Sequence, residues 1–345
     1  MLHQNSNHRE ILAAGRDVVA IGVGAAPTHP HPLSDNLTLR DLAFAAGSML
    51  RKQSQSEPDQ AVIARGLTTS DFSKTLADGV GGLVQRIYSA QAEHLRFCSM
   101  VPTKYLGTPT QLPGIDADLE LEPLVQGAEV RHGAAFTTAG ASNAILKSFA
   151  KTVFVSRELV VNDDLGALGR IFGALGSSAG RVESRIVAKT LETPNDLDDG
   201  AAFFSLNAGN LVADSGLTAT TLSAAMSFLR NQMTASGNRA DLALKHLVVS
   251  SELELTARLL VFSSGLPNVE ITVLATLPSA RWYALADPLI APVVGLLRLA
   301  GSKSPVLVEQ SKKRFSVDGA PVGVVADLGC ALLGRVGIVR CGVSA

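Results

Sequence analysis

The stretch NDDLGALGRIFGALGSSAGRVESRIVAKTLET, residues 162–193, decides how the rest of the chain is interpreted. Its apolar residues recur at alternating steps of three and four, which predicts one long amphipathic helix. Asp163 and Asp164 can cap the first turn, and Pro194 ends the helix. About 28 residues at ~1.5 Å each give a rod of roughly 42 Å, which suggests a spine. The apolar stripe consists of Leu165, Leu168, Phe172, Leu175, Ala179, Val182 and Ile186.

Glycines form a second strip on the same predicted helix, one residue after the apolar stripe. The strip is turned from the apolar stripe by about 100°. Each glycine costs the helix roughly 0.5 to 1 kcal/mol relative to alanine, so a regular strip indicates that another backbone packs against it. The alternative is a helix that is able to bend. The glycines are Gly166, Gly169, Gly173, Gly176 and Gly180.

Length and composition predict a protein with a substantial core. The chain has 345 residues, of which 46% are hydrophobic and 18% charged, enough for one large or two ordinary domains. A net charge of -1 gives no general attraction to nucleic acid or to an acidic membrane. Three cysteines without a CxxC pair argue against a zinc site or a disulfide framework. We expect a soluble protein made in the cytoplasm, without a signal peptide or a membrane span.

Residues 1–66 differ in character from the rest of the chain. GVGAAP could open a dinucleotide-binding turn, but Pro27 stands where the third glycine is required. Asn36 or Thr38 can cap a short amphipathic helix that ends near residue 50. The polar stretch 53–60 is typical of a linker, so a second unit begins near Arg65.

The chain then predicts a helix followed by an extended loop. Ser70 can cap a helix whose apolar residues follow helical spacing. Alternation of Leu119 and Leu121 with Glu120 and Glu122 favours a two-stranded structure beyond it. A hairpin of this kind has too little apolar surface to be stable alone, so it lies on something else.

Seven segments follow one another in the order found in a known family. They are TTSDF (68–72), LEPLVQGAE (121–129), VSRELVVNDDLGAL (155–168), DDGAAFFSLNAGNL (198–211), LTATTLSAAMSFLRNQ (217–232), WYALADP (282–288) and VDGAPVGVVADLGCALLGRVG (317–337). Together they resemble the major capsid proteins of tailed phages with the Hong Kong 97 fold. More narrowly, they resemble the Mu-like branch, which is often encoded as a fusion behind a prohead protease. Two departures are Asp327-Leu328, where the family has Asp-Phe, and Gly334-Arg335, where it has Asp-x-Arg.

The resemblance implies an α+β fold of the Hong Kong 97 type, with the long helix as the spine of a peripheral domain. The extended loop then reaches a neighbouring subunit, and its charged residues Glu120, Glu122, Glu129 and Arg131 are expected to take part in assembly. The implied divisions are an amino-terminal arm and linker (1–66), a helix leading into the peripheral domain (67–104), the extended loop (105–150), the peripheral domain with the spine (151–205), the axial domain (206–290) and return strands (291–345).

The resemblance also implies what the protein does and what it binds. Many copies form pentamers and hexamers of an icosahedral shell around double-stranded DNA, which is bound without sequence specificity. A portal and a prohead protease are the other implied partners, and no cofactor, metal or membrane is expected. The protein is then located in the virion, and in the host cytoplasm during assembly. Residues 1–66 cannot bury enough surface to fold alone, so we expect an arm on a neighbouring subunit or on the inner shell wall.

Two other classes of function remain as alternatives. Paired carboxylates, Asp163 with Asp164 and Asp198 with Asp199, could hold a metal or perform acid–base catalysis in an α/β enzyme. However, the first pair stands at a helix cap and the second pair precedes a glycine in a predicted turn. Encapsulin nanocompartments share the same fold and enclose enzymes instead of genomes. The sequence is closer to the phage branch.

Overall fold

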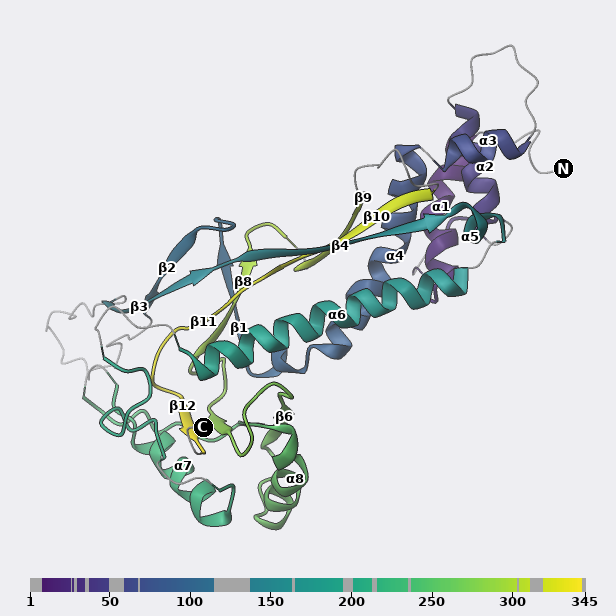
Figure 1. Ribbon diagram of the computed structural model, residues 1–345. Coiled ribbons are helices and arrows are strands. Elements are labelled where there is room, and N and C mark those ends of the chain that lie inside the picture. Colours follow the sequence, from purple (N-terminus) through teal and green to yellow (C-terminus); the bar gives the residue numbers. More distant parts are fainter. Residues whose placement is uncertain are drawn as a thin grey trace, which may run out of the picture. The chain divides into compact units, whose positions relative to one another are not determined.

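The computed structural model describes most of the chain, in two compact units that combine helices and strands (Figure 1). This confirms the expected α+β class. Unit 1 consists of Met1–Gln91, Ser148–Arg181 and Lys303–Asp327, and unit 2 consists of Ala92–Lys147, Val182–Ser302 and Leu328–Ala345. The described residues are 8–25, 27, 30–34, 37–49, 59–67, 69–114, 137–162, 165–194, 201–212, 216–234, 237–302, 304–310 and 319–342.

Unit 1 begins with helices that pack closely through small residues. The backbone of α3 touches α2 where Gly47 faces the Val62 carbonyl oxygen, and a Cβ at Gly79 of α4 would lie 2.5 Å from Val19 of α1. Thr38 caps α2, as one of the two alternatives expected. The cap of α4 is Thr69, not Ser70, because the Thr69 hydroxyl accepts the Phe72 amide at 3.2 Å. The helices are α1 (His8–Gly22), α2 (Leu39–Met49), α3 (Asp59–Gly66) and α4 (Ser70–Gln91).

The helices α1 to α3 within the first 66 residues are part of a folded unit. Ile11, Val18 and Leu42 are all buried, and α1 to α3 lie in the same unit as α4 of their own chain. Helix α1 includes residues 17–22, which lead into GVGAAP (22–27). These residues are therefore helical, and they do not form a strand that enters a nucleotide-binding turn. A contact of this segment with a neighbouring subunit stays a prediction.

The rest of unit 1 is a three-stranded sheet with helices. Strand β10 lies between β4 and β9, and it pairs with β9 in antiparallel register, Val324 opposite Val308. Ser148 of β4 donates a hydrogen bond to Asp327 at 2.5 Å. The elements are β4 (Lys147–Ser156), α5 (Arg157–Val161), β9 (Val306–Gln310) and β10 (Gly319–Leu328).

Unit 2 is built on a four-stranded sheet in the order β12-β7-β5-β6. Strand β7 is buried on both faces: Trp282 and Ala284 belong to one apolar cluster, and Tyr283 and Leu285 to another. Such an arrangement explains why its sequence is apolar without alternation. The elements are α7 (Ala219–Asn231), β5 (His246–Val249), a 3-10 turn η4 (Ser251–Leu253), α8 (Glu254–Ser263), β6 (Glu270–Val273), β7 (Trp282–Leu285) and β12 (Ile338–Cys341).

Two smaller sheets complete unit 2. In one, β8 lies between β1 and β11; in the other, β2 and β3 pair in antiparallel register. The second pair is a two-stranded structure within 105–150, but the alternating residues 119–122 from which one was predicted lie outside the described residues, as do Glu129 and Arg131. The elements are a 3-10 turn η3 (Glu93–Arg96), β1 (Ser99–Thr103), β2 (Pro109–Gly114), β3 (Thr137–Ile145), β8 (Val294–Leu299) and β11 (Cys330–Leu332).

Candidate assembly site on helix α6

Helix α6 (Leu165–Glu192) is a continuous helix of 28 residues, as the sequence predicts. Leu168, Phe172 and Ala179 of the apolar stripe are buried. The sequence assigns the whole helix to one domain, yet it passes from unit 1 into unit 2 after Arg181. Asp163 and Asp164 lie outside the described residues, so their capping role stays a prediction.

The glycine strip of α6 faces α4 within the same chain. A Cβ added at Gly176 would lie 2.6 Å from the Val84 carbonyl oxygen, and one at Gly180 would lie 3.3 Å from the Tyr88 carbonyl oxygen. At Gly176 the nearest atoms are all backbone atoms, which cannot rotate away, whereas at Gly180 the Gln91 side chain lies nearer, at 2.9 Å. The close backbone approach predicted from the regular spacing is thus found at Gly176, whereas Gly173 meets only the end of the Ile87 side chain. The role of these glycines in assembly is a separate question and stays a prediction.

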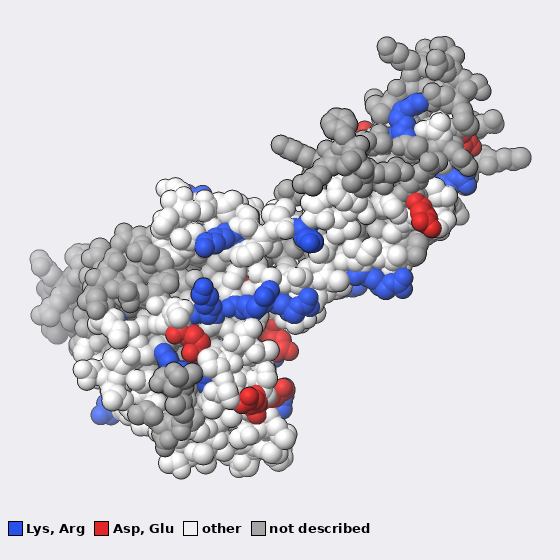
Figure 2. Space-filling view, viewed as in Figure 1, with Lys and Arg blue, Asp and Glu red and all other residues white. Residues whose placement is uncertain are grey.

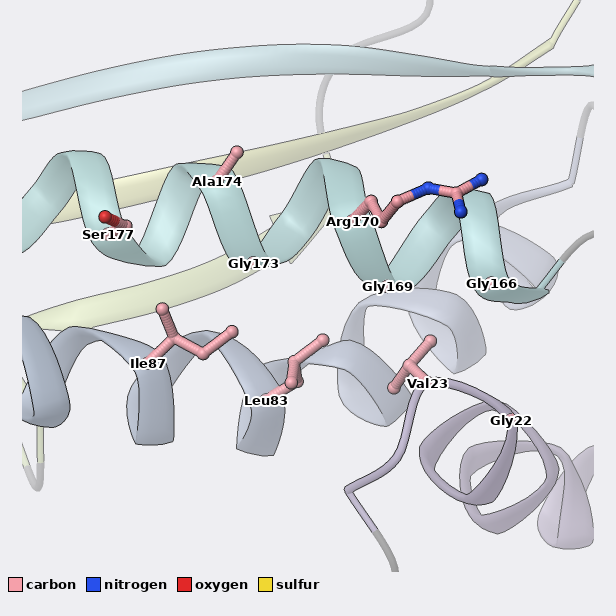
Figure 3. A pocket seen from close by; sticks show the side chains of 10 residues that line it. All are labelled: Gly22, Val23, Leu83, Ile87, Gly166, Gly169, Arg170, Gly173, Ala174 and Ser177. Carbon is pink, nitrogen blue, oxygen red and sulfur yellow. The ribbon is translucent and has the colours of Figure 1, made fainter.

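Towards the start of α6 the packing opens into a groove of about 550 Å³. Figure 3 shows Leu83 and Ile87 pointing from α4 towards α6, whereas Ala174 points away from α4 and Arg170 runs along α6 towards its start. Contacts are looser here, because a Cβ at Gly169 would lie 3.5 Å from its nearest atoms. Gly166, the first glycine of the strip, is exposed.

In unit 2, α6 is held by a buried carboxylate. Glu183 is fully buried, and its two oxygens lie 3.0 Å from His94 Nε2 and 2.5 Å from an Arg298 guanidinium nitrogen. A buried carboxylate is stable only when it is paired and hydrogen-bonded in this manner. His94 comes from η3 and Arg298 from β8, so Glu183 joins three elements that are distant in sequence.

Two buried thiols lie in the same region of unit 2. Burial raises the pKa of Cys98 well above its usual value, with further contributions from Cys330 and Glu183. Burial also raises the pKa of Cys330 to about 12. Burial therefore favours the protonated form of both thiols near neutral pH, in contrast to the lowered pKa that is typical of reactive cysteines.

The end of α6 has a second polar anchor. The Tyr283 hydroxyl donates to Glu192 at 2.7 Å, and Arg281 Nε forms an ion pair with the same carboxylate at 3.0 Å. Arg281 also donates to the Gly342 carbonyl oxygen at 2.7 Å. Burial, together with the neighbouring Glu192, raises the pKa of Tyr283, which keeps it a hydrogen-bond donor.

Sequence reasoning missed these polar anchors of α6. One signal was present: Glu183 follows Ala179 by four residues and precedes Ile186 by three, so an acid stands at the spacing of the apolar stripe. A carboxylate in such a place needs a buried partner. Nothing local in the sequence identifies Arg298 as that partner, since it lies 115 residues further along.

The described residues contain no group of three or more His, Cys, Asp or Glu side chains that could hold a metal ion. Within the same residues, no helix is long and apolar enough to span a membrane. His246 is buried in β5, and burial lowers its pKa. Asp198 and Asp199, the acidic pair considered for catalysis, lie outside the described ranges.

Residues 141–341, more than half of the chain, match the family described as phage capsid protein. The chain belongs to this family. The matched region includes all of α6, Glu183 and Arg298, and it confirms the capsid family expected from the seven sequence segments. Fusion to a prohead protease is not part of what the match shows. No curated protein matches the sequence.

Solved structures similar to this capsid protein are distant in sequence. A virus-like particle from Pyrococcus furiosus is 10% identical, with a TM-score of 0.48, over 76% of this chain and 97% of the other. A structure from Microbacterium phage Oxtober96 is 12% identical, with a TM-score of 0.44, over 86% of this chain and 97% of the other. A phage-related protein from Bordetella bronchiseptica RB50 is 12% identical, with a TM-score of 0.46, over 75% of this chain and 95% of the other. The assignment of the capsid protein to its family rests on the sequence match alone.

Proposed function

We propose that this capsid protein is the major subunit of the icosahedral head shell of a tailed phage or prophage, with double-stranded DNA inside. The observation that carries the proposal is the family match over residues 141–341. It is supported by the order of the seven segments typical of the Hong Kong 97-like branch. The role is structural and not catalytic, and a portal and a prohead protease are the further partners.

Self-assembly needs surfaces that bind other copies, and α8 offers one. Leu255, Leu259 and Phe262 lie at positions i, i+4 and i+7, so they share one face of the helix. Their exposed fractions are 69%, 60% and 87%. A contiguous exposed apolar strip of this kind marks an interaction site. Because the protein belongs to a capsid family, its occupant is a second copy of the chain.

A ring of identical subunits requires two different surfaces that complement each other. The second surface that we assign is the segment with Leu289 and Ile290, which are 92% and 72% exposed and also belong to unit 2. The α8 strip of one copy and this segment of the next would make a head-to-tail contact that closes into pentamers or hexamers. Residues 1–66 and the charged loop residues would add contacts between copies.

Electron microscopy of the purified full-length protein tests the function. Closed shells support it, and shells that contain DNA support the phage interpretation specifically. Shells filled with an enzyme would instead place the protein with encapsulins, and a small discrete oligomer would contradict the capsid role.

The α8 contact has its own test. Leu259→Ser with Phe262→Ser should abolish shells and leave dispersed subunits, since both side chains are exposed and their loss leaves the fold intact. Ser263→Ala on the same helix is the matched control and should assemble normally. Normal shells from the double variant would contradict the α8 contact while leaving the capsid function in place.

A further inference from the structure

The exposed face of α6 carries a line of positive charge. Arg170, Arg181, Arg185 and Lys189 are all exposed, and their spacing of 11, 4 and 4 residues keeps them within about 100° around the helix axis. Figure 2 shows Lys and Arg atoms following this helix. From the first to the last cation the line extends about 28 Å, at ~1.5 Å per residue. These four residues are called the basic stripe.

The acids of α6 do not neutralise the basic stripe. The helix has two acidic residues, Glu183 and Glu192. Glu183 is buried against Arg298 and His94, and Glu192 is paired with Arg281. Both carboxylates are thus occupied by cations outside the helix. Positive charge is thus concentrated on the exposed face of α6, although the net charge of the whole chain is -1.

Among the described residues, no ion pair joins a cation of the basic stripe to an acidic side chain. Within the part of the chain that the structure describes, Arg181 donates to the neutral Ser177 hydroxyl at 2.7 Å, and Arg185 and Lys189 form no ion pair. By contrast, Arg230 and Arg258, which are exposed on unit 2, pair with Asp241 and Glu254. The stripe is therefore available to a partner.

We propose that the basic stripe of α6 binds the phosphate backbone of double-stranded DNA, which assigns a contact surface to the capsid function proposed above and rests on it. Duplex DNA carries about one negative charge per ~1.7 Å of axis, so a line of cations finds phosphates in any sequence. Residues between the cations, Ala174 and Ser178, are small and allow close approach. The only aromatic residue of α6, Phe172, is buried, so the face has no ring on which single-stranded bases could stack.

An acidic protein segment is the competing partner. In the sequence, residues 115–131 carry Asp116, Asp118, Glu120, Glu122 and Glu129, so this segment of a second copy is the acidic alternative. Specific protein interfaces, however, place apolar or aromatic anchors among their charges to fix the register. Of the large apolar side chains of α6, Ile171 beside Arg170 is partly exposed at 36%, whereas the centre of the stripe carries only the small residues Ala174 and Ser178. The stripe fits a partner that is recognised by charge alone.

The test measures binding of a 30-base-pair duplex to the full-length protein by fluorescence anisotropy between 50 and 200 mM salt. Neutralisation of four phosphates should give a slope of about -3.6 in log K against log salt, which is a loss on the order of 10²-fold across this range. Each single change, such as Arg185→Gln, should reduce the slope by about 0.9. The fourfold variant Arg170→Gln, Arg181→Gln, Arg185→Gln and Lys189→Gln should lose salt-dependent binding.

A control variant changes the net charge equally at other exposed sites: Lys74→Gln, Lys104→Gln, Arg230→Gln and Arg258→Gln. It should bind the duplex with nearly the affinity and slope of the unchanged protein. Equal losses in both variants would overturn the proposal, because binding would then follow net charge. Glutamine is a good helix former, and far-ultraviolet circular dichroism verifies that both variants are folded.

Shell formation, followed by electron microscopy, separates the remaining outcomes. Shells that form from the fourfold variant but hold less DNA support the proposal. Loss of shells with unchanged duplex affinity would overturn it and identify a second copy as the partner of the stripe. Failure of the unchanged protein to form any shell would contradict the proposed function itself, whatever the duplex measurements show.

Discussion

The two halves of α6 are held by different kinds of interaction. In unit 1, Gly176 brings the helix against the backbone of α4 and Gly180 packs on Gln91, so the fit depends on the absence of side chains at these two positions. In unit 2, Glu183 and Glu192 bind cations and a tyrosine, and the fit depends on charge. The first half should therefore respond to added volume and the second half to lost charge and to pH.

Removal of the buried carboxylate should have the largest effect. Glu183→Ala leaves Arg298 and His94 without their partner, and breaking a buried ion pair of this kind costs about 3–5 kcal/mol. Urea unfolding followed by fluorescence of Trp282, the one tryptophan of the chain and a buried residue of unit 2, measures the loss.

Glu183→Gln is the matched control, since it keeps the side-chain volume and one hydrogen-bonding oxygen. It should lose less stability than the alanine variant. If Glu183→Ala unfolded at the same urea concentration as the unchanged protein, charge would not be what holds this half of α6.

Added volume should weaken the other half. A Cβ at Gly176 would lie 2.6 Å from the Val84 carbonyl oxygen, so Gly176→Ala must displace a backbone and should cost about 1–3 kcal/mol. Gly81→Ala in α4 is the control, because nothing lies within 4 Å of its added Cβ. That change should stabilise the protein by about 0.5–1 kcal/mol through helix propensity alone. Thermal unfolding by circular dichroism should shift in opposite directions; shifts of equal sign would remove the case for close packing.

Alkaline pH should weaken unit 2 selectively. All three cysteines, Cys98, Cys330 and Cys341, belong to unit 2, and burial raises the pKa of each. Unfolded thiols ionise near pH 8.5 whereas folded ones stay protonated, so the unfolded state holds fewer protons and stability falls as pH rises. For Cys330 the fall continues to about pH 12, at up to ~1.4 kcal/mol per pH unit.

The measurement is urea unfolding by Trp282 fluorescence at several pH values between 8 and 11. Cys330→Ala should be less stable at neutral pH, because it leaves a cavity, but its stability should depend less steeply on pH. An unchanged dependence on pH would mean that Cys330 does not contribute to it.

Secondary structure could be predicted from the sequence where hydrophobic periodicity or capping residues determine it. The limits of α6 and the capping of α2 by Thr38 follow from spacing and from residue type. Helix α1 was missed although the sequence carries a capping pattern for it: Asn7 stands directly before His8, and Glu10 follows three residues later. The partner of Glu183 was missed because a pairing across 115 residues depends on the assembled unit.

The smallest effect is expected at Gly173, where the two explanations of the glycine strip differ most clearly. A Cβ there would lie 2.9 Å from Cδ1 of Ile87, the far end of a flexible side chain that can move aside. Gly173→Ala should therefore change the unfolding temperature little and form normal shells, because the gain in helix propensity offsets the small displacement. Gly173→Leu must push α4 away and should block assembly. If the strip instead serves bending, alanine alone should already arrest expansion of the shell, which electron microscopy of heated or acidified shells would reveal as particles of unchanged diameter. Normal assembly and expansion with leucine at this position would contradict both explanations, and Gly176→Leu, which meets backbone and not a side-chain end, would then show whether any glycine of α6 is required.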